Sequence, residues 1–211
     1  MYLGGLCFIV SGTEDLTCLE AASMSLKAGV RWLQYREKNK DRRGLYIEAL
    51  ALRLLTSKFS AVLTINDYAD IALAVSADGL HIGQEDLPLT EARKLLGPGK
   101  IIGLSTHSVQ EARRAEAEGA DYIGFGPVFG SLTKDAGPPK GIAEIRRIRA
   151  SVRLPVVAIG GINHGNIESV LSAGADAAAV ASAILRGDAE GNARMLLEAL
   201  KPGGKEIPVD F

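Results

Sequence analysis

Short runs of β-branched and apolar residues alternate with longer amphipathic segments along most of this 211-residue chain. Eight runs have the length and composition of buried strands, at residues 6–10, 32–35, 62–65, 79–82, 101–104, 122–125, 156–159 and 177–180. Segments with helical spacing lie between them, for example at residues 46–55, 91–96, 109–118, 143–151 and 167–173. Strands that alternate with helices predict βαβ units and a parallel sheet. Eight such units predict an α/β fold, a single (β/α)8 TIM barrel.

A short repeated pattern in the sequence supports the count of eight βα units. Residues 27–30, 118–121 and 173–176 each place a glycine between a helical segment and the next strand, where glycine permits the left-handed backbone that ends many helices. A doubly wound open sheet is the alternative fold, but it usually has a glycine-rich turn after its first strand, and residues 11–15 form no such turn. We expect residues 1–200 to form the barrel and catalytic domain, and residues 201–211 to form an extended C-terminal tail.

Composition and charge narrow the class of partner. Hydrophobic residues make up 47% of the chain and aromatic residues 5%, which suits parallel strands covered by helices. The formal net charge of −1 gives no global attraction to nucleic acid or to an anionic membrane. Two cysteines without a nearby metal-ligand pattern, and an N-terminus without a signal peptide, predict a reduced, cytoplasmic protein. Small phosphorylated molecules are the expected partners, and homo-oligomerisation stays open.

Residues that follow the strands of such a barrel share one rim, where the chemistry of this fold takes place. After the second strand, Gln34, Arg36 and Lys38 alternate in an extended segment, so they can face one cavity. Two cations and an amide could grip a diphosphate. The alternative interpretation of this segment is a solvated run of charges.

Two carboxylates follow the third and fourth strands. Asp67 and Asp86 would lie on neighbouring loops of the rim, where they could hold Mg²⁺ beside a diphosphate. They could instead cap the helices that follow them. Asn66, next to Asp67, could orient a phosphate or close a turn.

The remaining rim segments carry hydroxyls, glycines and one lysine. Ser105 ends the fifth strand, and the long loop 124–140 contains Ser131, Thr133 and Lys134. Gly161 follows the seventh strand, while Ala181 and Ser182 follow the eighth, a place where backbone N–H groups often bind phosphate. His81 and His107 could act as general bases, but a structural histidine with satisfied hydrogen bonds is commoner, so both are interpreted as structural residues.

Taken in order, these motifs resemble thiamine-phosphate synthase. The resemblance rests on residues 34–38, 65–67, 81–86, 103–105, 126–134 and 159–162, and it covers nearly the whole chain. It implies condensation of a pyrimidine diphosphate with a thiazole phosphate, giving thiamine phosphate and diphosphate. It also implies that Asp67 and Asp86 bind Mg²⁺, and that one group of residues holds the pyrimidine diphosphate: Gln34, Arg36, Lys38, Asn66, Ser105 and Lys134. The residues implied for the thiazole phosphate are Ser131, Thr133, Gly161, Ala181 and Ser182.

The family chemistry implies that diphosphate leaves first and that the thiazole nitrogen then attacks the resulting cation. Arg36, Lys38, Ser105 and Lys134 are the expected catalytic residues. Two departures from the family pattern, at Gly130-Ser131 and at Ala181, bear on affinity more than on activity. A related thiazole tautomerase is one alternative, but that family typically has a catalytic histidine where Pro127 stands. A non-catalytic phosphate-sensing regulator is the other alternative, and it could lack the two carboxylates.

Overall fold

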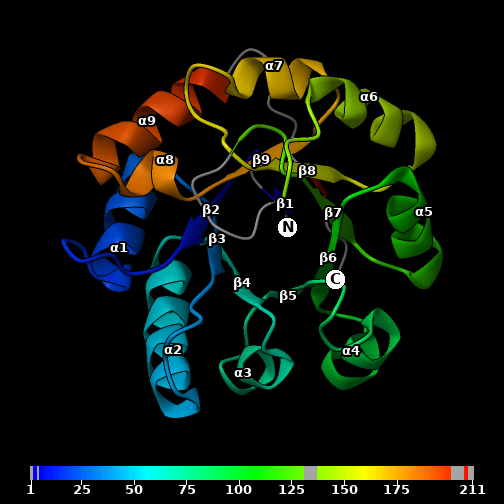
Figure 1. The fold of residues 1–211 in the computed structure, drawn as a ribbon. Coiled ribbons are helices and arrows are strands. Elements are labelled where there is room, and N and C mark those ends of the chain that lie inside the picture. The colour runs from blue at the N-terminus through cyan, green and yellow to red at the C-terminus, as the bar shows by residue number, and fades with distance from the viewer. Residues whose placement is uncertain (1, 4, 131–136, 201–206, 209–211) are drawn as a thin grey trace.

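Eight parallel strands close into a barrel in the computed structural model, which describes residues 2, 3, 5–130, 137–200, 207 and 208. Each barrel strand pairs with the next along the chain, and β9 pairs back with β2. The strands are β2 (Leu6–Val10), β3 (Trp32–Tyr35), β4 (Val62–Asn66), β5 (Gly79–Ile82), β6 (Ile101–Thr106), β7 (Tyr122–Phe125), β8 (Val156–Ile159) and β9 (Ala177–Val180). Helices surround this ring (Figure 1). The predicted (β/α)8 barrel is confirmed.

The helices that follow the strands begin and end at recognisable signals. Thr17 and Glu20 form a reciprocal capping box at the start of α1, while Asp41 and Ser108 cap α2 and α5. Gly29 and Gly119 end α1 and α5 in the left-handed conformation. The helices are α1 (Cys18–Ala28), α2 (Arg42–Lys58), α3 (Ala69–Ala74), α4 (Leu89–Leu96), α5 (Val109–Glu118), α6 (Ile142–Ser151), α7 (Ile167–Ser172), α8 (Ser182–Leu185) and α9 (Ala189–Leu200).

The two faces of the barrel wall have different roles. Outward side chains such as Leu33, Leu63 and Ile123 belong to the large core between strands and helices. Inward side chains fill the lower barrel with an apolar cluster: Cys7, Trp32, Val62, Ile101, Tyr122, Val157, Ala177 and Ala179. The rings of Trp32 and Tyr122 meet edge to face, with centroids 5.2 Å apart. The barrel is therefore packed below, and polar residues lie above this cluster.

The amino ends of three strands carry a repeated ion pair. An aspartate before the strand binds an arginine from the second helix before it in the chain, and also accepts a backbone N–H from the neighbouring strand. The pairs are Arg53–Asp78, Arg93–Asp121 and Arg149–Asp176. This ion pair explains two occurrences of the short repeated sequence pattern, since residues 118–121 and 173–176 each end in such an aspartate. Because these side chains satisfy one another's charges and hydrogen bonds, we assign the amino end of the barrel to the stability of the fold.

The first and last described segments meet outside the barrel. β1 (Tyr2–Leu3) pairs antiparallel with β10 (Ile207–Pro208). The proposed boundary between a barrel domain and a tail at residue 200 stays a prediction. Among the described residues, no helix is both long and apolar enough to cross a membrane.

Candidate active site at the carboxyl end of the barrel

Two amides form the polar layer directly above the apolar barrel core. Gln34 on β3 and Asn66 on β4 are both buried, and the Gln34 Nε2 donates to the Asn66 Oδ1 at 2.7 Å. The Cys7 Sγ lies 4.0 Å from the other amide atom of Gln34, its Oε1. The Asn66 oxygen accepts this hydrogen bond, and the amide N–H groups of Asn66 are available to donate to a ligand.

The carboxyl groups of Asp67 and Asp86 meet above this layer. Asp67 adopts a left-handed backbone conformation, with φ of 64°, and its backbone N–H donates to the His81 carbonyl at 2.8 Å. The Asp86 Oδ2 accepts the Gly83 N–H at 2.7 Å. Burial, then a hydrogen bond and repulsion from Asp86, raises the pKa of Asp67 to about 6. The predicted proximity of the two carboxylates is confirmed.

The alternative interpretation, that these aspartates cap helices, is wrong. In the described helices α3 and α4, the N-cap residues are Tyr68 and Pro88, and neither helix has a side-chain cap. Two hard oxygen ligands that repel each other in the absence of a cation fit a divalent metal such as Mg²⁺. Within the described residues, no group of three or more His, Cys, Asp or Glu side chains could hold a metal.

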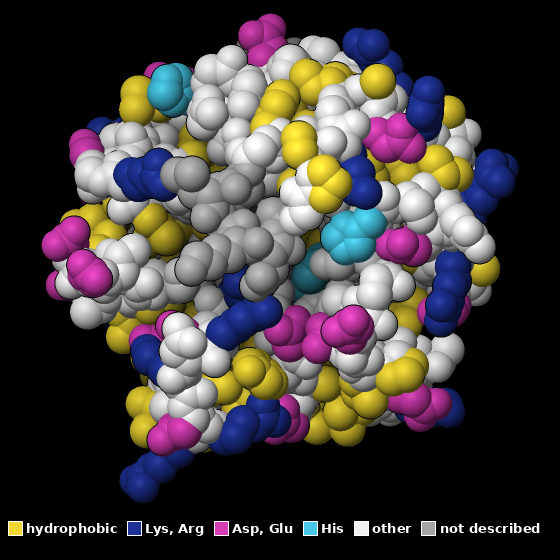
Figure 2. Space-filling view, viewed as in Figure 1, with side chains coloured by type: hydrophobic (Ala, Val, Ile, Leu, Met, Phe, Trp, Pro, Cys, Tyr) yellow, Lys and Arg dark blue, Asp and Glu magenta, His cyan; other side chains and the backbone are white. Residues whose placement is uncertain are grey.

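Positive charge lies beside the carboxylate pair. Arg36 is half-buried and Lys38 is exposed, and both lower the pKa of Asp67, so their charges act on the same place. The Arg36 N–H donates to the Val10 carbonyl at 3.1 Å, which continues the pairing of β3 with β2. Figure 2 shows acidic and basic side chains next to each other around the central hollow of this face.

A hydrogen-bonded network holds the loop that carries Arg36 and Lys38. The Tyr35 hydroxyl donates to Glu48 at 2.7 Å, and Lys40 binds the same carboxylate at 2.5 Å. The side chain of Glu37 accepts the backbone N–H groups of Lys38 and Asn39. The loop is thus anchored to α2 while its two cations stay at the barrel mouth.

Ser105, the predicted rim serine, has a partner that the sequence analysis missed. The Ser105 Oγ lies 2.9 Å from the His81 Nε2, and the His81 Nδ1 lies 2.9 Å from the Tyr122 hydroxyl. The sequence predicts only a structural role for His81, whereas the structure places it against a candidate site residue. The signal that could have indicated it is the pair of strand glycines, Gly103 and Gly124, that leave room for these rings.

The ends of β8 and β9 complete the rim. Gly160 and Gly161 have φ of 99° and 64°, and a Cβ on Gly161 would lie 2.5 Å from the Gly130 carbonyl oxygen. Ala181 precedes α8, whose first residue, Ser182, is exposed. Ser131, Thr133 and Lys134 lie outside the described residues, so their expected positions stay predictions.

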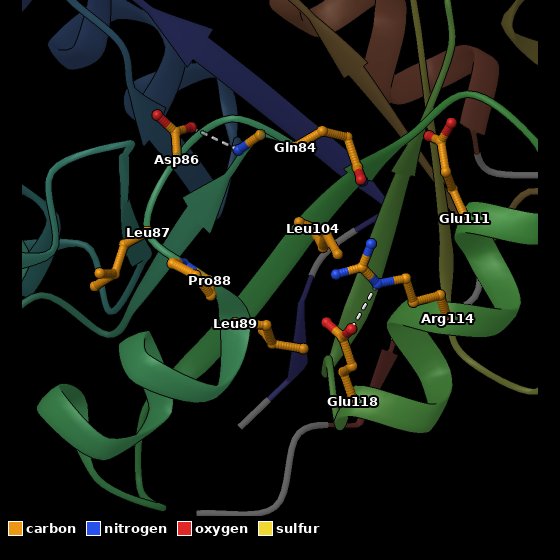
Figure 3. A pocket seen from close by; sticks show the side chains of 10 residues that line it. Gln84, Asp86, Leu87, Pro88, Leu89, Leu104, Glu111, Arg114 and Glu118 are labelled. Carbon is orange, nitrogen blue, oxygen red and sulfur yellow. Dashed lines mark hydrogen bonds and ion pairs between the residues drawn. The ribbon is translucent and has the colours of Figure 1, made fainter.

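A pocket lies on the outer side of the barrel wall, between the β5–α4 loop and α5 (Figure 3). Gln84 and Asp86 border it, and Leu104, on the outward face of β6, forms part of its wall. Arg114 and Glu118 form an ion pair on its α5 side. Asp86 thus belongs both to this lining and to the carboxyl pair, whereas Arg36 and Lys38 do not line the pocket.

Several known proteins resemble this chain in sequence or in structure. The model of the thiamine monophosphate synthase family matches residues 6–184. A thiamine-phosphate synthase from Moorella thermoacetica is 49% identical over 184 residues, which are 86% of this chain and 88% of that protein. A thiamine phosphate pyrophosphorylase from Pyrococcus furiosus has a similar structure, with a TM-score of 0.85, 37% identity and coverage of 93% and 95% of the two chains. A 3-hexulose-6-phosphate synthase, 18% identical with a TM-score of 0.71, shares the fold.

Proposed function

The chain belongs to the thiamine monophosphate synthase family, and from that premise we propose that its barrel mouth joins a pyrimidine diphosphate to a thiazole phosphate. Its activity is that of a thiamine-phosphate synthase, a transferase that releases thiamine phosphate and diphosphate. One observation carries the assignment of the site: the paired carboxyls of Asp67 and Asp86 lie within reach of the charges of Arg36 and Lys38. Cationic side chains of this kind bind the negative charge of a diphosphate, and paired carboxylates of this kind bind a divalent metal.

The chain's own residues favour departure of the diphosphate. When the bond between the pyrimidine methylene carbon and the bridging oxygen breaks, negative charge grows on that oxygen. Arg36 and Lys38 offset this charge, while Asn66 and Ser105 donate hydrogen bonds to the phosphate oxygens. Each preorganised donor of this kind is typically worth about 3 kcal/mol of barrier lowering. Lys134 adds a third cation in this proposal.

The two aspartates would hold Mg²⁺ in this proposal. A bound Mg²⁺ would neutralise charge on the diphosphate oxygens as the leaving group departs. The raised pKa of Asp67 supports the assignment, because two carboxyl groups held close together repel each other when both are ionised, and a bound cation would offset that repulsion. Asp67 and Asp86 have no helix-capping role that would otherwise explain them.

The second substrate would bind on the opposite side of the mouth. Backbone N–H groups near Gly161 and Ser182 would bind the thiazole phosphate, with Ala181 contributing main chain only. Contacts from Ser131 and Thr133 belong to the same proposal. Once the pyrimidine cation forms, the thiazole nitrogen attacks its methylene carbon, so the new carbon–nitrogen bond replaces the broken carbon–oxygen bond.

A two-substrate assay tests this function. Purified protein is incubated with both substrates in Mg²⁺ or in excess EDTA, and thiamine phosphate and diphosphate are quantified together. We expect equal amounts of both products with Mg²⁺ and little of either with EDTA. The Asp67→Asn variant should lose activity, whereas Glu85→Gln, which removes an exposed carboxylate from the same rim, should keep it.

The outcomes separate this function from its rivals. A tautomerase would convert the thiazole without releasing diphosphate, and Pro127 offers no side-chain acid or base for that reaction. A phosphate-sensing regulator would bind the substrates and release nothing. Absence of thiamine phosphate with both substrates and Mg²⁺ would refute the proposed activity, and full activity in EDTA would refute the metal site.

A further inference from the structure

Three side chains from neighbouring strands form a continuous chain of hydrogen bonds inside the barrel. Tyr122 on β7 contacts the His81 Nδ1 on β5, and the His81 Nε2 contacts the Ser105 Oγ on β6, each at 2.9 Å. The rings of His81 and Tyr122 are stacked, with centroids 5.4 Å apart. Tyr122 and His81 are buried, while Ser105 is partly exposed at the mouth. The chain therefore leads from the barrel interior to the site.

Two glycines make this arrangement possible. In the strand register, Gly103 stands between His81 and Tyr122, so the hydroxyl of Tyr122 reaches across β6 to the imidazole. A Cβ on Gly103 would lie 2.0 Å from the Tyr122 Cζ. A Cβ on Gly124 would lie 2.9 Å from the His81 Cε1. The barrel wall is thus shaped around this pair of rings.

The charge state of the imidazole limits how the protons can be placed. His81 is buried, and its two ring nitrogens contact two hydroxyls and no carboxylate in the described structure, so the ring is uncharged and has one N–H. Burial also raises the pKa of Tyr122, so its phenol keeps its proton. Among the described residues, His81 is the hydrogen-bond partner of that hydroxyl. A buried O–H without an acceptor is costly, so the Tyr122 hydroxyl donates to the His81 Nδ1.

The direction of the remaining bonds follows. With Nδ1 accepting, the single proton of the ring is on Nε2, and Nε2 donates to the Ser105 Oγ. The Ser105 carbonyl is separately bound by the Gln84 Nε2 at 2.6 Å. The hydroxyl proton of Ser105 is then free to point toward the mouth, where the carboxylate pair and the cations lie.

We propose that Tyr122 and His81 are positioning residues that fix Ser105 as a hydrogen-bond donor to an anionic oxygen of the departing diphosphate. This role rests on the proposed function, since it requires a diphosphate at the mouth. His81 transfers no proton in this role. It orients one, so that the Ser105 donor is already in place when negative charge develops.

The tautomer of the His81 imidazole tests the hydrogen-bonded chain from Tyr122 to Ser105 in the absence of substrate. Nitrogen NMR of protein labelled at histidine separates a protonated from an unprotonated ring nitrogen, and the chain has three histidines, so a His81 variant assigns the signals. We expect a protonated Nε2 and an unprotonated Nδ1 for His81 at a pH of about 7.5. In Tyr122→Phe, the Nδ1-protonated form should become populated. A protonated Nδ1 in the unmodified protein would overturn the proposal even if the enzyme is an active synthase.

Kinetics with matched variants tests the consequence for catalysis. The amide nitrogen of Gln can replace Nε2–H as the donor to Ser105, whereas the shorter Asn places its amide nitrogen near the position of Nδ1. His81→Gln should therefore keep most of kcat, while His81→Asn should lose up to about 100-fold, the scale of one preorganised donor. The KM for the thiazole phosphate should change little in either variant.

A double-variant comparison separates positioning from packing. If Tyr122 and His81 act through Ser105, Tyr122→Phe should lower kcat in the unmodified protein and have little further effect in Ser105→Ala. Equal losses in both backgrounds would refute the proposal. Thermal melts check folding of each variant, and Tyr122→Phe, which keeps the ring, decides the question if a His81 variant fails to fold. A protein with the predicted tautomer but no synthase activity would refute the proposed function, while the hydrogen-bonded chain from Tyr122 to Ser105 would still stand.

Discussion

Replacing Asp86 with asparagine should stabilise the metal-free protein at neutral pH while abolishing its activity. In the folded chain, burial and then Asp86 raise the pKa of Asp67 from 3.8 to about 6. A carboxyl whose pKa is raised by folding stabilises the fold below pH about 4, and this contribution is lost as the pH rises through about 6. Above that pH, two adjacent carboxylates repel each other. Removing one charge removes the repulsion.

The size of the effect follows from the pKa of Asp67. Each tenfold change in proton affinity is worth about 1.4 kcal/mol, so the whole rise would correspond to about 3 kcal/mol. Asp67 is only half-buried, and burial itself, which the substitution leaves in place, is the largest cause of the rise. Solvent screening, together with the share of the pKa rise that comes from burial, reduces the expected gain in the free energy of unfolding to about 1 kcal/mol. For a chain of this length, that gain raises Tm by about 3 °C.

Scanning calorimetry in EDTA at pH values of about 7.5 and about 4.5, on either side of the pKa of Asp67, measures this gain. The gain should be present at the higher pH and nearly absent at the lower, where Asp67 is protonated in the unmodified protein. The introduced side-chain amide keeps an oxygen for the Gly83 N–H, so the loop conformation should survive. Glu85→Gln, with the same change in net charge on the same loop, is the matched control. An equal gain in the control, or a loss of stability in Asp86→Asn, would refute the reasoning.

Further substitutions test the barrel wall and the proposed leaving-group contacts. Gly103→Ala should lower the free energy of unfolding by about 3 kcal/mol, because its Cβ would overlap the Tyr122 ring. Gly99→Ala, with open space around it in the described structure, should change that free energy by less than about 0.5 kcal/mol in the same urea titration. Lys134→Ala should lower kcat far more than it raises the KM for the thiazole phosphate. Steady-state kinetics decides this, and an unchanged kcat removes Lys134 from the mechanism.

The architecture was predictable because its signals are local. Six of the eight predicted barrel strands have the observed bounds, and β4 and β6 extend one and two residues further. The extensions add Asn66 at the end of β4 and Ser105 and Thr106 at the end of β6, where polar side chains weaken the strand pattern although backbone pairing continues. Pairing between β1 and β10 joins two-residue segments about 200 positions apart, and no local pattern indicates it.

The site was predictable only in part, for reasons of geometry. Asp67 and Asp86 follow adjacent parallel strands, so their convergence follows from the fold alone. The contact between His81 and Ser105 depends on strand register and on the space left by Gly103. The glycine itself can be read from the sequence, but the register that aligns Gly103 with His81 and Tyr122 cannot. The left-handed backbone of Asp67 is likewise a product of its loop, because aspartate tolerates that conformation without requiring it.

The position of the metal and the diphosphate tests the proposed site most directly. Crystals soaked with Mn²⁺ and the pyrimidine diphosphate allow the metal to be located by anomalous scattering. We predict one peak between the carboxylates of Asp67 and Asp86, with the diphosphate between that peak and Arg36. A metal bound in the pocket beside α5, or at the amino ends of the strands, with the carboxylate pair unchanged, would contradict this prediction.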